Sequence, residues 1–259
     1  MIWTLQRLIG RLVRVSPKTP LGRLLRAPLG LLPRGACLPV VSGPLRGARW
    51  IFGAATQGCW LGTYETKVQV ALCNKISAGD VVYDIGANVG FHTLLASRCT
   101  GSLGKVYAFE PLPRNLDLLA QHVAVNNLEN VSVVEIALAK SQGKRAFTAA
   151  DNPSMGRLSL AGELTVETAS LDTLIAEGSI QPPNLMKIDV EGSEGEVLAG
   201  GARCIDQYRP LIVLAVHGGT ARTESFDFLT ARGYSLASLD RTSLDDSSEI
   251  LADPGAASA

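Results

Sequence analysis

The chain has 259 residues, of which 46% are hydrophobic and 19% are charged, enough for one sizeable α/β domain with additions. Its 24 basic and 24 acidic residues balance, but the first fifty residues hold nine basic side chains and no acidic one. The rest of the chain therefore carries an excess of nine negative charges, which argues against nucleic acid as its main partner.

The cysteines and the apolar runs indicate the cellular compartment in which the protein is expected. Five cysteines are scattered without a C-x-x-C pair, which excludes a zinc ribbon and disfavours a disulfide framework. A reducing interior fits best, so we expect a cytoplasmic protein. The longest apolar stretch, residues 50–64, holds three glycines and a glutamine and is too short to span a membrane. Because Arg7, Arg11 and Arg14 interrupt the N-terminal apolar run, no secretory signal is indicated.

The N-terminal region is predicted to be a basic amphipathic helix followed by an irregular connector. In residues 2–15, isoleucines and leucines recur at helical spacing opposite three arginines. Three roles stay open for this helix: a lid on the sheet, contact with an anionic membrane surface, or binding of an acidic protein. Residues 16–49 are rich in proline and glycine and end in a strand near 46–52. The predicted divisions are 1–45 for helix and connector, 46–252 for the main domain and 253–259 for a disordered tail.

From residue 64 onward, helical and strand patterns alternate, which predicts an α/β fold with a doubly wound, mostly parallel sheet. Three of the strands are apolar on both faces, as in a parallel sheet covered by helices. The expected helices cover residues 65–76, 91–98, 114–126, 193–198 and 223–232. The expected strands cover residues 81–85, 105–109, 131–136, 145–149, 164–168, 185–189, 211–216 and 234–239.

The stretch DIGANVG follows the first of these strands and predicts a ligand-binding turn at the carboxyl edge of the sheet. A dinucleotide fingerprint would need glycines where Asn88 and Phe91 stand, so that fingerprint fails. Asp84 would repel a pyrophosphate but suits a cationic group, such as the sulfonium of S-adenosylmethionine (SAM). Glu110, at the end of the next strand, can accept both ribose hydroxyls of SAM or of a nicotinamide cofactor. Asp84 and the missing glycines therefore favour SAM.

Several motifs occur in a recognisable order: GDVVYDIGANVGFHTLLAS, VYAFEPLPRNLDLLAQHVAVNN, VSVVEIALA, SLDTLIAEG, LMKIDVEGSEGEVLAGG and RPLIVLAVHGG. Together they resemble the FkbM-type family of SAM-dependent methyltransferases. The resemblance implies a class I methyltransferase fold and O-methylation of a hydroxyl on a sugar, polyketide or other secondary metabolite. It also implies that Tyr64 and Glu65 lie near the methionine end of the cofactor. One position departs from the family, since Ala215 stands where relatives commonly have a glutamate. The expected cofactor-binding residues are Asp84, Gly86, Ala87, Asn88, Gly90, Glu110, Tyr64, Glu65 and Ala137.

Three polar residues at the same edge are the candidates for chemistry. Asp189 and Glu191 follow the strand 185–189 two residues apart, and His217 follows the strand 211–216. Methyl transfer from a sulfonium mainly demands positioning, but an alcohol is a poor nucleophile and benefits from a base or a metal. We expect these three side chains to be catalytic. Asp189 and Glu191 could also hold a divalent ion such as Mg²⁺, although the version without a metal is preferred.

Other polar residues have structural interpretations. Glu194 and Glu196 fit a helix start, with Ser193-x-x-Glu196 as a capping box. His92 is expected to be packed and His122 to be solvated, whereas the pattern explains no partner for Lys187.

The sequence favours a SAM-dependent O-methyltransferase that acts on a hydroxyl of a carbohydrate, lipid-linked or secondary-metabolite acceptor. Two alternatives remain: a nicotinamide-dependent oxidoreductase, and a non-catalytic SAM-binding or interaction module.

Overall fold

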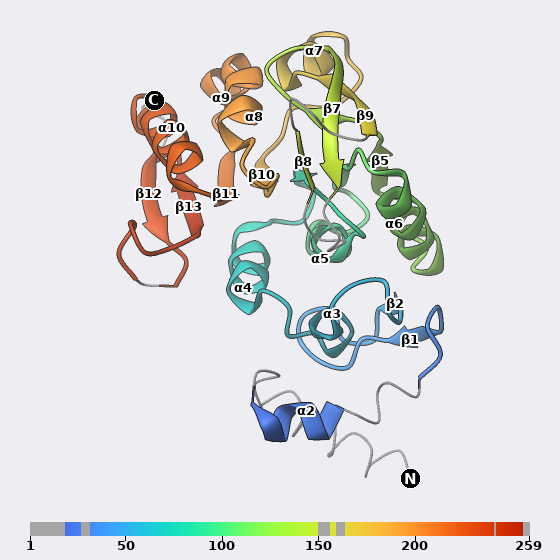
Figure 1. Ribbon diagram of the computed structural model, residues 1–259. Coiled ribbons are helices and arrows are strands. Elements are labelled where there is room, and N and C mark those ends of the chain that lie inside the picture. The colour runs from blue at the N-terminus through green and yellow to red at the C-terminus, as the bar shows by residue number, and fades with distance from the viewer. Residues whose placement is uncertain (1–18, 27–31, 150–155, 159–163, 241, 256–259) are drawn as a thin grey trace. The chain divides into compact units, whose positions relative to one another are not determined.

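The computed structural model describes residues 19–26, 32–149, 156–158, 164–240 and 242–255 (Figure 1). The chain forms two compact units, Met1–Thr66 and Lys67–Ala259, and the boundary suggested near residue 46 stays a prediction. The predicted amphipathic helix, residues 2–15, lies outside the described residues. Among the helices that are described, none combines the length and the apolar character needed to cross a bilayer.

The first unit contains more regular structure than the expected connector. Its elements are α2 (Pro20–Arg26), β1 (Cys37–Pro39), β2 (Arg49–Ile51) and α3 (Gln57–Leu61). β1 and β2 pair antiparallel, with Leu38 opposite Trp50. Pro20 begins α2, since the first helical position needs no N–H donor. Gly62, which follows α3, has a φ of 77°, and a Cβ there would lie 1.9 Å from the carbonyl oxygen of Ser42.

The second unit carries the alternating elements that the sequence predicts. Its helices are α4 (Thr66–Lys75, which begins at the unit boundary), α5 (Phe91–Thr100), α6 (Pro113–Val125), α7 (Leu171–Ala176), α8 (Glu194–Gly200), α9 (Ala202–Tyr208) and α10 (Gly219–Thr230). Its strands are β3 (Val81–Ile85), β4 (Lys105–Phe109), β5 (Val131–Val134), β6 (Ala137–Leu138), β7 (Gly143–Ala149), β8 (Gly156–Leu158), β9 (Leu164–Ala169), β10 (Leu185–Ile188), β11 (Leu211–Ala215), β12 (Ser235–Ser238) and β13 (Glu249–Asp253).

The main sheet has seven strands in the order β12-β13-β11-β10-β3-β4-β5. Neighbours from β11 to β5 pair parallel, and β13 runs antiparallel to both β11 and β12. The strand order reverses between β3 and β10, where doubly wound sheets place their ligands. The predicted doubly wound α/β architecture, and with it the class I methyltransferase fold, is confirmed.

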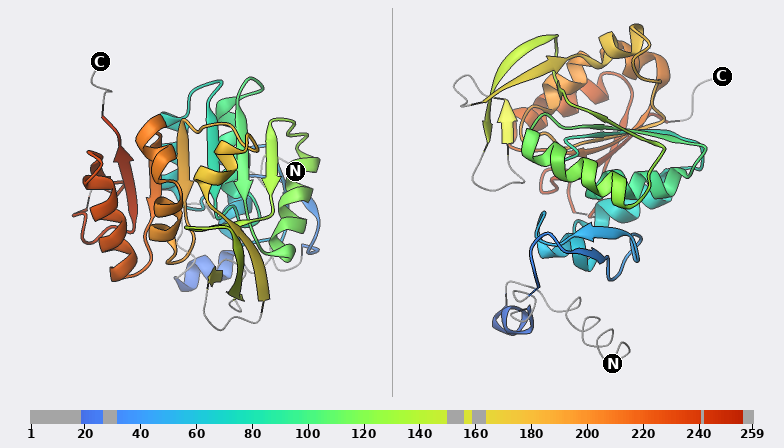
Figure 2. Two further views of the ribbon diagram at one scale, coloured as in Figure 1. Left: turned by 90° about the horizontal axis from the view of Figure 1, so that it is seen from above. Right: turned by 90° about the vertical axis from the view of Figure 1, so that its right-hand side faces the viewer.

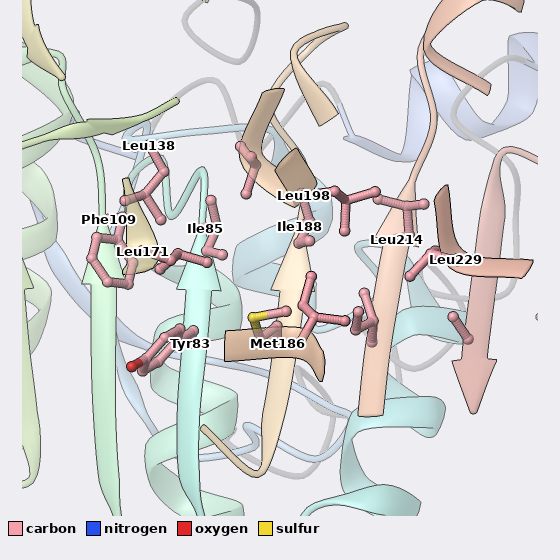
Figure 3. Packing of buried hydrophobic residues seen from close by; sticks show 14 of the residues in the cluster. Tyr83, Ile85, Phe109, Leu138, Leu171, Met186, Ile188, Leu198, Leu214 and Leu229 are labelled. Atoms are coloured by element: carbon pink, nitrogen blue, oxygen red, sulfur yellow. The ribbon is translucent and has the colours of Figure 1, made fainter. Parts of the chain in front are cut away.

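Helices cover both faces of this sheet, with α5 and α6 on one side and α7, α8 and α9 on the other (Figure 2). Alternation along each strand sends successive side chains to opposite faces, so Tyr83 and Ile85 face the α7–α9 side. There they join Met186 and Ile188 in a large apolar core. Figure 3 shows these four side chains together with Phe109, Leu138, Leu171, Leu198, Leu214 and Leu229. Burial of this apolar surface is the main drive that holds the helices on the sheet.

Several elements escape the sequence analysis. β13 covers Glu249–Asp253 and inserts between β11 and β12, although the expected run of elements ends at residue 239. Asp253, expected to begin a disordered tail, is the last residue of this strand. β6 and β8 were not expected either; they join β7 and β9, which contain the predicted strands 145–149 and 164–168, in a second sheet of the order β6-β9-β7-β8.

The expectation that His122 is solvated is wrong. His122 lies on α6 and is fully buried, and its Nδ1 donates a hydrogen bond to the carbonyl oxygen of Val89 at 2.7 Å. This bond ties α6 to the turn that follows β3. Burial lowers the pKa of His122 to about 4, against the smaller opposing effect of the hydrogen bond.

His122 should make the fold sensitive to acid. Its unfolded form takes up a proton below pH about 6.5, whereas the folded form does so only near pH 4. The free energy of unfolding should therefore fall by up to about 3 kcal/mol as the pH drops from 6.5 to 4. Urea unfolding of the wild type and of His122→Gln at several pH values measures this difference. His92 adds pH dependence to both proteins, so only their difference reports on His122; equal slopes would contradict the assignment.

Candidate functional site

The carboxyl ends of β3, β4, β10 and β11 meet at one edge of the sheet, because these strands run parallel. Asp84 lies near the end of β3, and Glu110 directly follows β4. Asp189 directly follows β10, and His217 lies two residues after β11. The topology thus brings these four predicted cofactor and catalytic residues to a common edge.

Lys187 joins two of these carboxylates inside the sheet. In the parallel ladder Lys187 stands directly beside Asp84. Its Nζ lies 3.4 Å from Oδ1 of Asp84, 3.3 Å from Oδ2 of Asp189 and 3.3 Å from the carbonyl oxygen of Gly86. Lys187 is only 5% exposed and Asp84 only 1%. The partner of Lys187, which the sequence left unexplained, is therefore this pair of aspartates.

Asp84 also accepts a hydrogen bond from the hydroxyl of Thr93 at 2.6 Å. Its carboxylate is thus engaged by β10 and by helix α5. The direct contact between Asp84 and a cationic ligand, which the sequence suggests, stays a prediction. In the structure, Asp84 also joins the strand β3, the strand β10 and the helix α5.

The turn DIGANVG packs against the end of β10. Gly86 has a φ of 76°, and a Cβ there would lie 1.8 Å from the carbonyl oxygen of Asp189. The N–H groups of Gly86 and Ala87 both donate to the carbonyl oxygen of Phe109. Gly90 has a φ of 93°, and a Cβ there would lie 2.5 Å from Cδ1 of Leu119. Glycine is needed at both ends of the turn, because each end approaches neighbouring atoms closely.

Glu110 holds the same turn from the other side. Its Oε2 accepts a hydrogen bond from the N–H of Asn88 at 2.8 Å. Its Oε1 accepts bonds from the N–H of Leu112 at 3.0 Å and from the side-chain amide of Asn115 at 3.2 Å. Burial raises the pKa of Glu110, and these three bonds counteract the rise. Asn88 itself adopts a left-handed φ of 51°.

Asp189, Glu191 and His217 form a cluster, as their spacing predicts. Nε2 of His217 lies 3.8 Å from Oδ1 of Asp189 and 3.6 Å from Oε2 of Glu191. One potential ligand atom from each of the three residues lies within 4.8 Å of the other two. The side chains are 22%, 25% and 35% exposed in the order Asp189, Glu191 and His217, so a ligand can reach them.

Glu194 is the residue that the sequence analysis misread. It is fully buried in the first turn of α8, and its Oε1 lies 2.9 Å from Nδ1 of His217 and accepts a 2.9 Å bond from the N–H of Gly192. The expected capping box is wrong, since the side chain of Ser193 caps no N–H and Glu196 binds Arg145. The available signal was a second glutamate, two positions before Glu196 and next to the glycines at 192 and 195.

The cluster shifts the ionisation of its own members. The hydrogen bond to Glu194 raises the pKa of His217 to about 9, and Asp189 and Glu191 add to the rise while partial burial opposes it. Partial burial raises the pKa of Glu191, with His217 acting in the opposite direction. In the protein alone, a proton on His217 thus offsets part of the negative charge around it.

The other residues singled out from the sequence have the following places in their own elements. Ala137 is buried in β6 and packs with Leu112. Tyr64 and Glu65 belong to the first unit, and their expected place beside the cofactor stays a prediction. Ala215 is buried at the end of β11. His92 is buried as expected, and burial followed by the charge of Lys187 lowers its pKa to about 3.

The profile of the methyltransferase FkbM domain matches residues 84–236 of this chain. The chain belongs to the FkbM methyltransferase family. The match begins at Asp84 and ends inside β12, so it contains the glycine turn, Glu110 and the cluster.

Named relatives share part of this region. Hexuronic acid methyltransferase AglP of Haloferax volcanii is 30% identical over 157 residues, which cover 60% of this chain and 63% of AglP. The 31-O-demethyl-FK506 methyltransferase FkbM of Streptomyces tacrolimicus is 31% identical over 49% of this chain and 61% of its own. The chain thus spans about three-fifths of the length of these relatives.

Among solved structures, methyltransferase FkbM from Methylobacillus flagellatus superposes with a TM-score of 0.49 at 15% identity. The superposition covers 78% of this chain and 55% of the other.

Replacing the buried ammonium should destabilise the second unit. Lys187→Met keeps a long side chain but leaves Asp84 and Asp189 without their shared cation, which should cost about 3–5 kcal/mol in the free energy of unfolding. Urea unfolding followed by circular dichroism measures the loss. The exposed Lys140→Met is the control and should change stability by less than about 0.5 kcal/mol. Adding Asp84→Asn to Lys187→Met should recover part of the loss; equal losses for Lys187→Met and Lys140→Met would rule out this role.

Proposed function

We propose that the chain is a SAM-dependent O-methyltransferase that acts on a hydroxyl of a carbohydrate, lipid-linked or secondary-metabolite acceptor. The observation that carries the proposal is the cluster of Asp189, Glu191 and His217 at the same sheet edge as the glycine turn. A cofactor on the turn and an acceptor at the cluster would then be neighbours.

The donor groups of this edge fit SAM. Oε1 of Glu110 accepts from the N–H of Leu112 and from the side chain of Asn115, and Oε2 accepts from the N–H of Asn88. Since a carboxylate oxygen offers two lone pairs, Oε2 can also accept a ribose hydroxyl. The N-terminus of α5 directly follows the turn, and the positive end of a helix dipole favours a negatively charged group such as the carboxylate of SAM. Asp189 has a partly exposed carboxylate, but Lys187 balances part of its charge, so it should add only weakly to the attraction of a sulfonium.

The cluster is suited to hold an acceptor hydroxyl. The acceptor hydroxyl donates a hydrogen bond to a carboxylate oxygen of Asp189 or Glu191. The oxygen of the hydroxyl then faces away from the cluster. SAM supplies the methyl group, so that a carbon–oxygen bond forms as the carbon–sulfur bond breaks and S-adenosylhomocysteine leaves. The carboxylate that held the hydroxyl takes its proton. Fixed positioning of this kind is the main source of rate in a displacement reaction.

The relatives' names support the acceptor class. AglP is named for methylation of hexuronic acid, and the Streptomyces protein for 31-O-demethyl-FK506. Both names point to oxygen-rich small molecules or sugars, and the second specifies an oxygen as the methylated atom. A carbohydrate or secondary-metabolite hydroxyl is therefore the acceptor that we propose for this chain.

The two alternatives predict different binding. A nicotinamide-dependent oxidoreductase would bind NAD(H) and not SAM, and membership in the FkbM family disfavours it. A non-catalytic module would bind SAM without turnover over a broad panel of hydroxyl acceptors. Isothermal titration with both cofactors, followed by an assay for S-adenosylhomocysteine over that panel, separates the three possibilities.

Glu110 should be required for SAM affinity. Glu110→Gln preserves the size of the side chain but removes its charge and replaces one acceptor oxygen by an amide group. The loss should be on the order of 2 kcal/mol, or about 30-fold in the dissociation constant measured by calorimetry. Glu129→Gln, an exposed carboxylate beyond α6, is the matched control. Near-normal SAM affinity in folded Glu110→Gln would show that Glu110 does not hold the ribose.

Asp189 should be required for turnover more than for binding. Asp189→Asn should abolish formation of S-adenosylhomocysteine and leave SAM affinity within a few-fold, as expected for a group that acts mainly in the transition state. Glu196→Gln, which alters a carboxylate of the same segment that binds Arg145, should retain activity. Wild-type turnover by Asp189→Asn would mean that positioning by other residues drives the reaction.

A further inference from the structure

The orientation of His217 leaves three acceptor atoms facing one another. Because Nδ1 of His217 is held by the buried carboxylate of Glu194 at 2.9 Å, the imidazole keeps its proton on Nδ1 when it is neutral. Its Nε2 lone pair then faces oxygen atoms of Asp189 and Glu191 at 3.8 and 3.6 Å. In the protein alone a proton on Nε2 relieves the repulsion among these atoms. When that proton leaves, the three lone pairs converge on one region that a metal ion can occupy in its place.

The spacing of the three atoms suits an ion better than direct hydrogen bonds. Distances of 3.6 and 3.8 Å from Nε2 exceed ordinary hydrogen-bond lengths. Atoms separated by these distances, and by up to 4.8 Å for the third pair, share a central point about 2.1–2.4 Å from each. First-row divalent ions bind imidazole nitrogen and carboxylate oxygen at about 2.0–2.2 Å. Small side-chain rotations would therefore complete the coordination.

The excess of negative charge around the cluster also favours the binding of a cation. The described ion pairs link four carboxylates, those of Asp84, Asp189, Glu191 and Glu194, through Lys187 and His217. With a neutral imidazole, this group carries three negative charges in excess. Lys187 binds Oδ2 of Asp189 and leaves Oδ1, the oxygen that faces His217, for another positive partner.

We propose that Asp189, Glu191 and His217 bind a divalent metal ion, with Glu194 as the residue that orients His217. The proposal replaces the metal-free version that the sequence favoured, and Glu194 is the reason for the change. A carboxylate behind a ligating histidine fixes its tautomer and is a recurrent feature of metal sites. Two carboxylates and one imidazole suit an ion that accepts both oxygen and nitrogen, such as Mn²⁺.

The chemical role of this ion rests on the proposed function. Three protein ligands leave coordination positions open, and an acceptor hydroxyl bound there would lose its proton more readily. Asp189 would then serve as a ligand, which agrees with the loss of turnover predicted above for Asp189→Asn. Ion binding itself can be measured without SAM or acceptor.

The test is titration of the full chain with Mn²⁺ alone, followed by electron paramagnetic resonance of free Mn²⁺ and by calorimetry. The wild type should bind one Mn²⁺ at the cluster. Glu191→Gln and His217→Gln should each weaken this binding by at least about tenfold, and Glu194→Gln by about tenfold through the loss of orientation. Glu196→Gln should bind as the wild type does. Circular dichroism confirms that each variant is folded, and the conservative Glu191→Gln keeps the test valid if His217→Gln is unstable.

Each result decides the proposal. No Mn²⁺ binding up to about 1 mM, or binding that survives both Glu191→Gln and His217→Gln, would overturn it. Turnover unchanged by EDTA in protein shown to be free of metal would overturn the catalytic role of the ion. SAM affinity, measured on the same samples, separates the two proposals. SAM binding without Mn²⁺ binding supports the methyltransferase proposal and contradicts the metal site. Mn²⁺ binding without SAM binding supports the metal site and contradicts the methyltransferase proposal.

Discussion

The site depends on one buried ammonium group. Lys187 lies between Asp84 and Asp189 and also reaches the carbonyl oxygen of Gly86. It thereby connects β3, the glycine turn and the end of β10, the three segments that form the switch point of the sheet. An unpaired lysine in this position would be costly to bury. The ion pairs that make the burial of Lys187 possible also fix the orientation of Asp189. The stability of the sheet and the geometry of the site therefore depend on the same contacts.

Much of this arrangement could be predicted from local patterns. β3 and β4 have the predicted bounds, Val81–Ile85 and Lys105–Phe109, because each short apolar run is followed within two residues by a glycine or a proline. The cluster of Asp189, Glu191 and His217 followed from a simple rule, that parallel strands end at one edge. These predictions needed only the order of strands and the position of each polar residue along the chain.

What could not be predicted depends on contacts between distant segments. The partner of Lys187 depends on the register of β10 against β3, which no local pattern reveals. His122 looked solvated because its helix is amphipathic, yet its position faces the turn at Val89. Glu194 looked like an ordinary acid in a first helical turn, and its contact with His217 spans 23 residues. In each case, tertiary packing decided the environment of a titratable side chain.

The antiparallel strand β13 has a consequence for how the chain folds. In the described part of the sheet, β12 pairs with β13 and β13 pairs with β11, so a segment made later joins two strands made before it. During synthesis, β12 and helix α10 can be complete while the place between β11 and β12 is still open. The exposed edge of β11 is then available to other chains, as unpaired strand edges are in folding intermediates. Closure of the sheet therefore has to wait for residues 249–253 to leave the ribosome.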